Sequence, residues 1–311
     1  MRLLRSLLPG IVVLAIALVA SGVLEPTQLE GLTSTPVATL LLVPVLRLTM
    51  FVSGALALGG TALLLLGAGA DVRRASTAGA VAFAISSAAL EVVTLADVMA
   101  VQWWEALDPT MLRSFVTQID EGRYLATQVV LGIIGAWVIT RARQPLDTAF
   151  AAVALAIAVT LPGYTGHSAA AVTHWVASAT MVAHLSAMSV WVGAVMLLAV
   201  DRDPDVLQRF GRVASGALGL LLVSGVASVL ARTNDWAGFL GDPYAWMLGV
   251  KLALTGLLLV IAAASRRLVR EARAEGRQSF PAAVLATLSI EVVTMGAVLA
   301  VAVVLARMPN P

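Results

Sequence analysis

Long runs of apolar residues are the feature of this sequence that most restricts its fold. A helix needs roughly 20 apolar residues to cross the hydrocarbon core of a bilayer. Nine segments approach or exceed that length: residues 7–24, 40–66, 78–100, 124–140, 148–163, 175–200, 213–231, 245–265 and 282–306. We therefore expect an all-α integral membrane protein, a polytopic helical bundle of about nine transmembrane helices.

The composition supports this fold class and excludes several others. Hydrophobic residues make up 59% of the 311 residues and charged residues only 12%, whereas a soluble domain is about one-quarter charged. A soluble fold of this size could not cover so much apolar surface. Disorder, a nucleic-acid-binding domain and a water-soluble enzyme are therefore excluded, and we expect no enzymatic activity. Cysteine is absent from the sequence, which removes disulfides, thiolate metal sites and cysteine nucleophiles.

The first apolar run, residues 7–24, has two interpretations. Arg2 and Arg5 precede it, as basic residues do in a secretory signal peptide. Its best cleavage point follows Ala20, but Leu18 stands where a cleavage site has a small residue. We therefore favour a retained anchor helix. Cleavage would leave eight transmembrane helices with the same orientation.

Basic residues are distributed unevenly over the segments between the spans. If the N-terminus is inside, the inner segments carry 14 of them and the outer segments carry 4, while Arg47 and Lys251 lie within spans. Because basic residues gather on the cytoplasmic side, this bias predicts that the N-terminus is inside and the C-terminus outside. The same bias explains the basic residues without a nucleic-acid partner. We expect a multi-pass protein of the bacterial cytoplasmic (inner) membrane.

Ionisable residues within the spans are functional candidates, because a charge in the hydrocarbon costs several kcal/mol unless it is paired or hydrated. They are Arg47, Glu91, Asp97, His184, Lys251 and Glu291. A rise of 1.5 Å per residue places His184 and Glu91 roughly 12–15 Å below the outer surface. Charge compensation or a relay is one role for the other five. Structural ion pairs, of Arg47 with Glu91 or Asp97 and of Lys251 with Glu291, are the alternative.

All three histidines of the chain fall within eighteen residues. At about 100° per residue, His174, Met181, His184 and Met188 occupy an arc of roughly 80° on one helix face, and His167 lies in the loop before it. Imidazole and thioether are neutral ligands that suit copper, and thioethers favour Cu(I). The pattern predicts a copper site near the outer surface. The alternative is that the methionines fill packing positions and the histidine is a hydrogen-bonded core residue.

The segment that contains the histidines resembles the signature of the copper resistance protein D family. The matching elements are Gly166–His167, His174, and His184 followed by Trp191 and Gly193. Downstream, the family pattern Tyr-Gly-x-x-Leu-x-x-Lys appears with Ala245 in place of its glycine; its residues are Tyr244, Ala245, Leu248 and Lys251. Residues 115–125 are similar to the outer loop of actinobacterial members. Residues 289–311 resemble the end of the copper domain in members that continue into a CtaG-like domain.

The resemblance implies a protein that binds copper at its outer face and imports it, or delivers it across or within the cytoplasmic membrane. It places His167, His174 and His184 at the metal, and it includes Lys251 and the packing residues Trp191 and Gly193. Besides the copper ion and the lipid bilayer, it implies a periplasmic copper chaperone and cytochrome oxidase assembly components as partners.

Three parts of one compact bundle are expected. They are an anchor helix with an outer loop over residues 1–39, an N-terminal helical half over residues 40–163, and a copper domain over residues 164–311.

Two other functions remain open. A b-type cytochrome would hold haem between helices, but two bis-histidine haems need four intramembrane histidines. The chain offers one, plus two near the surface, so no haem is expected. A copper-assembly factor for cytochrome oxidase that does not transport copper fits the same residues as a transporter does.

Overall fold

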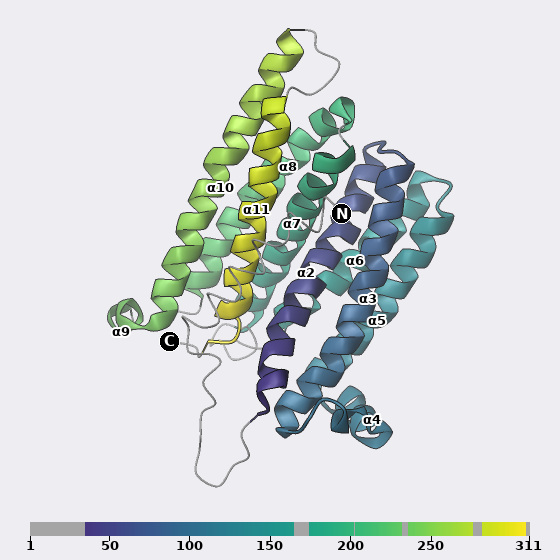
Figure 1. Ribbon diagram of the computed structural model, residues 1–311, viewed down its shortest axis with the longest axis vertical. Coiled ribbons are helices and arrows are strands. Elements are labelled where there is room, and N and C mark those ends of the chain that lie inside the picture. The colour runs from purple at the N-terminus through teal and green to yellow at the C-terminus, as the bar shows by residue number, and fades with distance from the viewer. Residues whose placement is uncertain (1–34, 165–173, 202, 232–235, 276–281, 309–311) are drawn as a thin grey trace.

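The computed structural model describes residues 35–164, 174–201, 203–231, 236–275 and 282–308, and these residues form helices and short connections without a strand (Figure 1). The helices are α2 (Val37–Leu65), α3 (Ala70–Met99), α4 (Pro109–Gln118), α5 (Asp120–Arg141), α6 (Pro145–Thr160), α7 (His174–Asp201), α8 (Pro204–Leu230), α9 (Trp236–Gly241), α10 (Pro243–Ala274) and α11 (Ala282–Leu305). Two short 3₁₀ turns, η1 (Glu105–Leu107) and η2 (Leu161–Tyr164), complete the described elements.

Eight helices in the described part of the chain are long and apolar enough to cross a membrane: α2, α3, α5, α6, α7, α8, α10 and α11. Each coincides with one of the predicted spans after residue 40, so the predicted helical membrane bundle is confirmed. The remaining predicted span, residues 7–24, lies outside the described residues.

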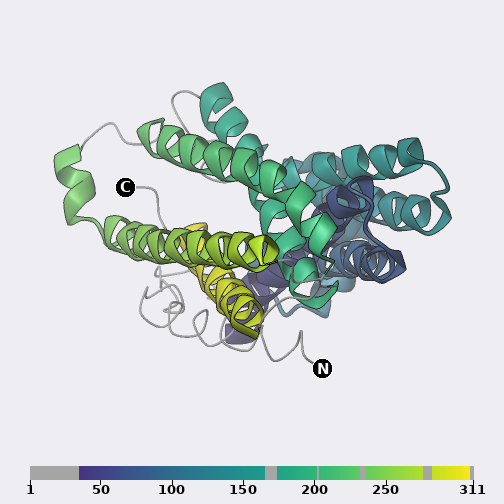
Figure 2. The same ribbon diagram turned by 90° about the horizontal axis from the view of Figure 1, so that it is seen from above.

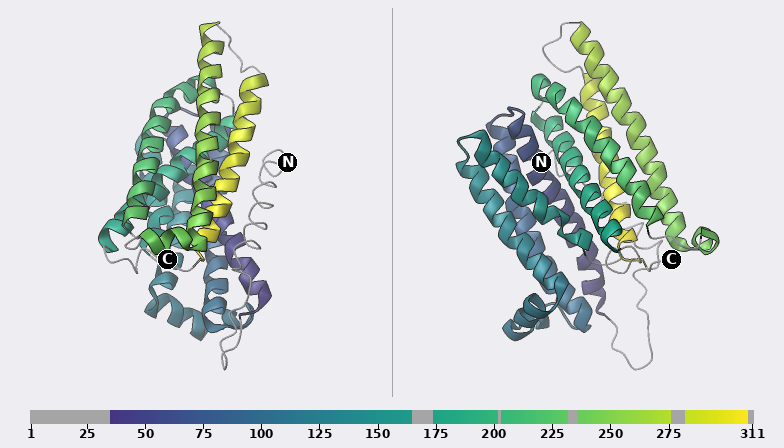
Figure 3. Two further views of the ribbon diagram at one scale, coloured as in Figure 1. Left: turned by 90° about the vertical axis from the view of Figure 1, so that its left-hand side faces the viewer. Right: turned by 180° about the vertical axis from the view of Figure 1, so that it is seen from behind.

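The two ends of the bundle differ in composition. Helices α2, α5, α7 and α10 end on the same side of the bundle, at the top of Figure 1, and α4 and α9 lie on the opposite side, as Figure 3 also shows. Arg73, Arg141, Arg209 and Arg266 belong to the first end. We keep the predicted orientation and refer to this end as the inner one and to the end with α4 and α9 as the outer one.

Several helices continue past their apolar runs with polar turns. Helix α3 begins at Ala70 rather than at residue 78, and in its first turns Arg73 donates hydrogen bonds to the carbonyls of Ile139 and Ala142, at 3.0 and 2.9 Å. Helix α10 continues to Ala274 rather than ending at residue 265. Hydropathy therefore located the apolar part of each helix and missed its polar turns.

A short helix, α4, forms in the outer segment between the predicted spans 78–100 and 124–140. The carboxylate of Asp108 accepts hydrogen bonds from the backbone N–H groups of Thr110 and Met111, at 2.9 and 3.0 Å, and Pro109 occupies the first helical position. Both features are favoured at helix starts, because the first turn has unpaired N–H groups. Just before α4, the exposed rings of Trp103 and Trp104 meet edge to face.

Buried apolar side chains form two clusters that share helix α2. One cluster joins α2 to α3, α5 and α6, with Phe83 and Leu155 among its buried members. The other joins α2 mainly to α7, α8, α10 and α11, with Phe210 among its buried members. Seen from above, α10 and α11 extend to one side of the bundle, and α5 and α6 lie on the opposite side (Figure 2). The domain limits at residues 39 and 163 stay a prediction.

Helices α2 and α7 cross at backbone contact, because glycines face each other there. A Cβ atom on Gly193 would lie 1.7 Å from the carbonyl oxygen of Ala55, and one on Gly59 would lie 2.4 Å from the backbone nitrogen of Ala194. Only hydrogen fits at either position, as at other close helix crossings in membranes. Trp191 is buried next to this crossing. The crossing therefore fixes the height of α7, and with it the height of His184.

We expect Gly193→Ala to destabilise the bundle strongly, because the new methyl group would overlap the backbone of α2. Overpacking a tight core costs about 1–3 kcal/mol and sometimes more. Gly219→Ala on α8 is the matched control, since its Cβ atom would meet nothing within 4 Å. Thermal unfolding in detergent should show a melting temperature several degrees lower for Gly193→Ala alone. Equal melting temperatures for the two variants would contradict the crossing.

Candidate functional site

His184 lies on α7 in the outer half of the bundle and faces α8. Its Nδ1 atom is 3.2 Å from the hydroxyl oxygen of Ser224, a buried residue of α8. The Ser224 hydroxyl in turn donates to the carbonyl of Leu221, at 3.2 Å. The single hydroxyl proton of Ser224 is used in this bond, so the serine oxygen acts as an acceptor toward the histidine. We therefore assign the ring proton of His184 to Nδ1, which donates to Ser224. The neutral ring then has its lone pair on Nε2, the form in which imidazole binds metals.

Of the other predicted metal ligands, the structure describes the side chains of Met181 and Met188. Met188 lies one turn further along α7 and is buried in the second cluster, whereas Met181 is partly buried beside Gly163 of η2. His174 is the first residue of α7, and its side chain lies outside the described part of the structure, as does all of His167. No group of three His, Cys, Asp or Glu residues gathers within the described residues.

Two ion pairs occupy the outer end of the bundle. Arg47 of α2 binds Glu121 in the first turn of α5, at 2.9 Å, and Asp97 of α3 binds Arg307 just after α11, at 3.2 Å. The prediction that Arg47 pairs with Glu91 or Asp97 is therefore wrong. Sequence reasoning missed Glu121 because it counted that residue with an outer loop, whereas it begins a helix at the depth of Arg47.

These four side chains balance one another. Arg47 is close enough to Arg307 and Asp97 to interact with both electrostatically, so the two pairs form one group with no net charge. One pair joins the C-terminal end of α11 to α3, and the other joins α2 to α5. The two ion pairs therefore explain why Arg47 and Asp97 lie within the spans. Their geometry indicates a structural role, in which they link neighbouring helices.

Glu91 has surroundings of a different kind. Its Oε1 atom is buried and has no hydrogen-bond partner among the described residues, and the same holds for the hydroxyl oxygens of Ser87 and Thr94. The spacing places all three residues on one face of α3. Buried polar atoms are nearly always hydrogen-bonded to protein or water, so a group of three without partners needs an explanation. Glu91 keeps its predicted role as a candidate relay residue.

Glu291 and Lys251 lie far apart on the bundle. Glu291 of α11 is buried, and its polar neighbours are Ser265 and Arg266 of α10. Ser265 is about 14 residues, or about 21 Å, from Lys251 along that helix. The predicted pair of Lys251 with Glu291 is therefore wrong. Lys251 lies in the outer half of α10, whereas Glu291 lies in the inner half of the bundle.

We expect the ion pair between Asp97 and Arg307 to stabilise the folded bundle. Asp97→Arg or Arg307→Asp alone should lower the free energy of unfolding by about 1–3 kcal/mol, less than for a fully buried pair because both side chains are partly exposed. The double exchange should recover most of this loss. Asp71→Ala, which removes the exposed pair with Arg74, should have no measurable effect. A double exchange no more stable than the single variants in thermal unfolding would refute the pair.

Comparison with protein families adds an independent line of evidence. The model of the copper resistance protein D-like N-terminal domain matches residues 34–175, and the model of copper resistance protein D matches residues 204–305. No curated protein and no solved structure matches the chain.

The two matches cover α2 to α6 and α8 to α11, and most of α7 lies between them. A site role for His184 therefore rests on the chemistry and position of that residue. For the chain as a whole, the matches confirm the resemblance on which the sequence expectations were based. This protein belongs to the copper resistance protein D family.

Proposed function

We propose that this protein binds copper at the outer side of the membrane and passes it inward through its helical bundle. Membership of the copper resistance protein D family supports copper as the ligand. The observation that carries the proposal is the position of His184, an imidazole inside a membrane-spanning helix whose Nδ1 is held by a buried serine. An ionisable residue at that depth lowers the stability of the helix in the membrane, so its presence indicates a functional role.

The chemistry of the route follows from the neutral ligands that the sequence offers. His167 and His174 precede α7 and would take copper from the outer side. His184 would receive it next, with Met188 one turn further inward. Transfer between neutral ligands adds no negative charge to the hydrocarbon region, and each imidazole or thioether would replace part of the ion's hydration shell. The protein then acts as a binding and transport protein rather than an enzyme, in the cytoplasmic membrane of a bacterium.

Two partners extend this proposal outside the bundle. A periplasmic copper chaperone would supply the outer histidines, since free copper is scarce and ligand exchange needs a donor. Components of cytochrome oxidase assembly would be recipients if the metal is delivered within the membrane. Glu91, with its unpartnered Oε1 atom, would compensate the charge of passing copper or relay a proton.

We expect His184→Ala to weaken copper binding by about tenfold or more, because it removes the ligand inside the bundle. Thr180→Ala, one turn earlier on α7, is the matched control, since its hydroxyl bonds only its own helix at Ala177. The measurement is a copper titration of the purified full-length protein against a competing chelator. Unchanged affinity in both His184→Ala and the double variant His167→Ala/His174→Ala would end the histidine-site proposal.

The same purified protein tests the alternative function, a b-type cytochrome. A b-type cytochrome would show a Soret band in its visible spectrum, and that band would overturn the reading of His184 as a copper ligand. We expect a colourless protein as purified without added metal.

We expect Ser224→Ala to weaken copper binding by up to about tenfold, because the hydroxyl orients the ring of His184 and groups of this kind tune metal ligands. Ser228→Ala is the control: this buried serine lies one turn further along α8, and its hydroxyl oxygen has no partner among the described residues. The same competition titration measures both variants. Equal affinities for the two would show that Ser224 does not position the ligand.

A further inference from the structure

Thioether side chains line the core inward of His184. Met188 and Met196 of α7 and Met295 of α11 are 8%, 3% and 1% exposed, and all three belong to the same buried cluster. A rise of 1.5 Å per residue places Met188 about 6 Å and Met196 about 18 Å from His184 along α7. The described structure thus places sulfur atoms at intervals between the outer histidine and the inner half of the bundle.

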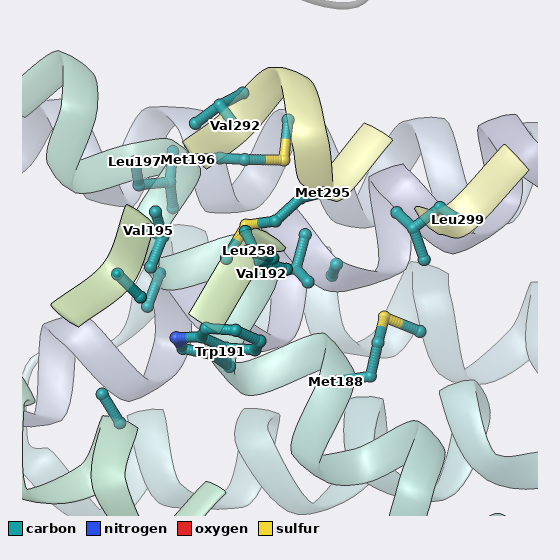
Figure 4. Close-up of a cluster of buried hydrophobic side chains, with 14 of the residues drawn as sticks. Met188, Trp191, Val192, Val195, Met196, Leu197, Leu258, Val292, Met295 and Leu299 are labelled. Carbon is teal, nitrogen blue, oxygen red and sulfur yellow. The ribbon is translucent and has the colours of Figure 1, made fainter. Parts of the chain in front are cut away.

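Met196 and Met295 come from helices that face each other. In Figure 4 the side chain of Met196 extends from α7 toward α11, and that of Met295 extends from α11 into the cluster between the helices. Leu258 of α10 belongs to the same group, so three membrane-spanning helices meet at this point. A ligand bound here would be enclosed by side chains of α7, α10 and α11.

A carboxylate lies close to this group. Glu291 is 3% exposed and precedes Met295 by four residues on α11, so the two residues share a helix face. The charged residue nearest to it from α10 is Arg266, whose guanidinium donates to the hydroxyl of Ser215 on α8, at 3.1 Å. Within the described residues no ion pair to Glu291 forms. A buried carboxylate in a membrane-spanning helix is costly, and packing alone does not account for it.

We propose that Met196, Met295 and Glu291 form a second copper site, inward of His184 and selective for Cu(I). Thioether sulfur is a soft ligand that favours Cu(I) over harder cations. The carboxylate of Glu291 would offset the single charge of Cu(I) within the ligand set, which lowers the cost of holding the ion in the hydrocarbon region. The inference rests on the proposed function, because this site would receive the copper that leaves His184. Met188 lies between His184 and the second site.

The competing explanation is that the methionines only fill space. Methionine adapts to irregular gaps in cores, and leucine of similar volume would then serve equally well. Exchange of methionine for leucine usually costs less than about 1.5 kcal/mol, so such variants should fold. Loss of sulfur at constant volume therefore separates a ligand from a packing residue.

The test is a Cu(I) titration of the full-length protein in lipid vesicles against a Cu(I) chelator, repeated with Ag(I) as a soft ion that does not change oxidation state. The variant Met196→Leu/Met295→Leu should lose one equivalent of bound Cu(I) relative to the unaltered protein. Met247→Leu/Met308→Leu is the matched control, because both methionines pack on the same cluster nearer the outer end. Glu291→Gln should weaken the second equivalent by about tenfold through loss of the compensating charge.

X-ray absorption of selenomethionine-labelled protein loaded with Cu(I) gives a direct second measurement. We expect copper–selenium scattering in the labelled protein. Its amplitude should be unchanged in the control variant and lower in Met196→Leu/Met295→Leu. Unchanged stoichiometry in that variant, or absence of copper–selenium scattering in the labelled protein, would overturn the inner site. If His184→Ala still lowers copper affinity in that case, the proposed function stands without the inner site.

Discussion

The close crossing of α2 and α7 fixes these two helices against each other at the place where the two buried clusters share α2. At Gly59 and Gly193 the two backbones touch, so neither helix can slide along or rotate about the other without a clash. Helix α2 belongs to both buried clusters, and α7 places Met188 and Met196 in the second cluster. This backbone contact fixes the height of His184 in the membrane, while its register against Ser224 depends on the packing of α7 on α8.

The polar residues of the bundle fall into two classes when judged by their partners. Arg47, Glu121, Asp97 and Arg307 neutralise one another at the outer end, so their cost of burial is offset within the protein. Glu91 and Glu291 have no ion pair among the described residues, although both lie in spans. Because no ion pair among these residues offsets the burial of Glu91 or Glu291, the second class is the more informative one.

Hydropathy predicted the eight described spans closely, because a chain in lipid must satisfy its backbone hydrogen bonds within each helix. The same reasoning did not predict contacts between helices, because hydropathy does not show which helices are adjacent. Depth along a helix follows from counting residues, but the choice of Glu121 rather than Glu91 as the partner of Arg47 depends on which helices are adjacent. Ser224, forty residues from His184, and Met295, in the last helix, could not be placed beside α7 by spacing alone. The four-residue interval of Met188 from His184 was visible, because both lie on one helix.

Copper uptake into sealed vesicles that contain only this protein separates transport from binding, because binding alone fits an assembly factor as well as a transporter. With copper outside and a copper-sensitive dye inside, we expect saturable entry in proportion to the amount of protein and loss of that entry in His184→Ala. Copper that binds the protein but enters no faster than into protein-free vesicles would contradict passage through the bundle.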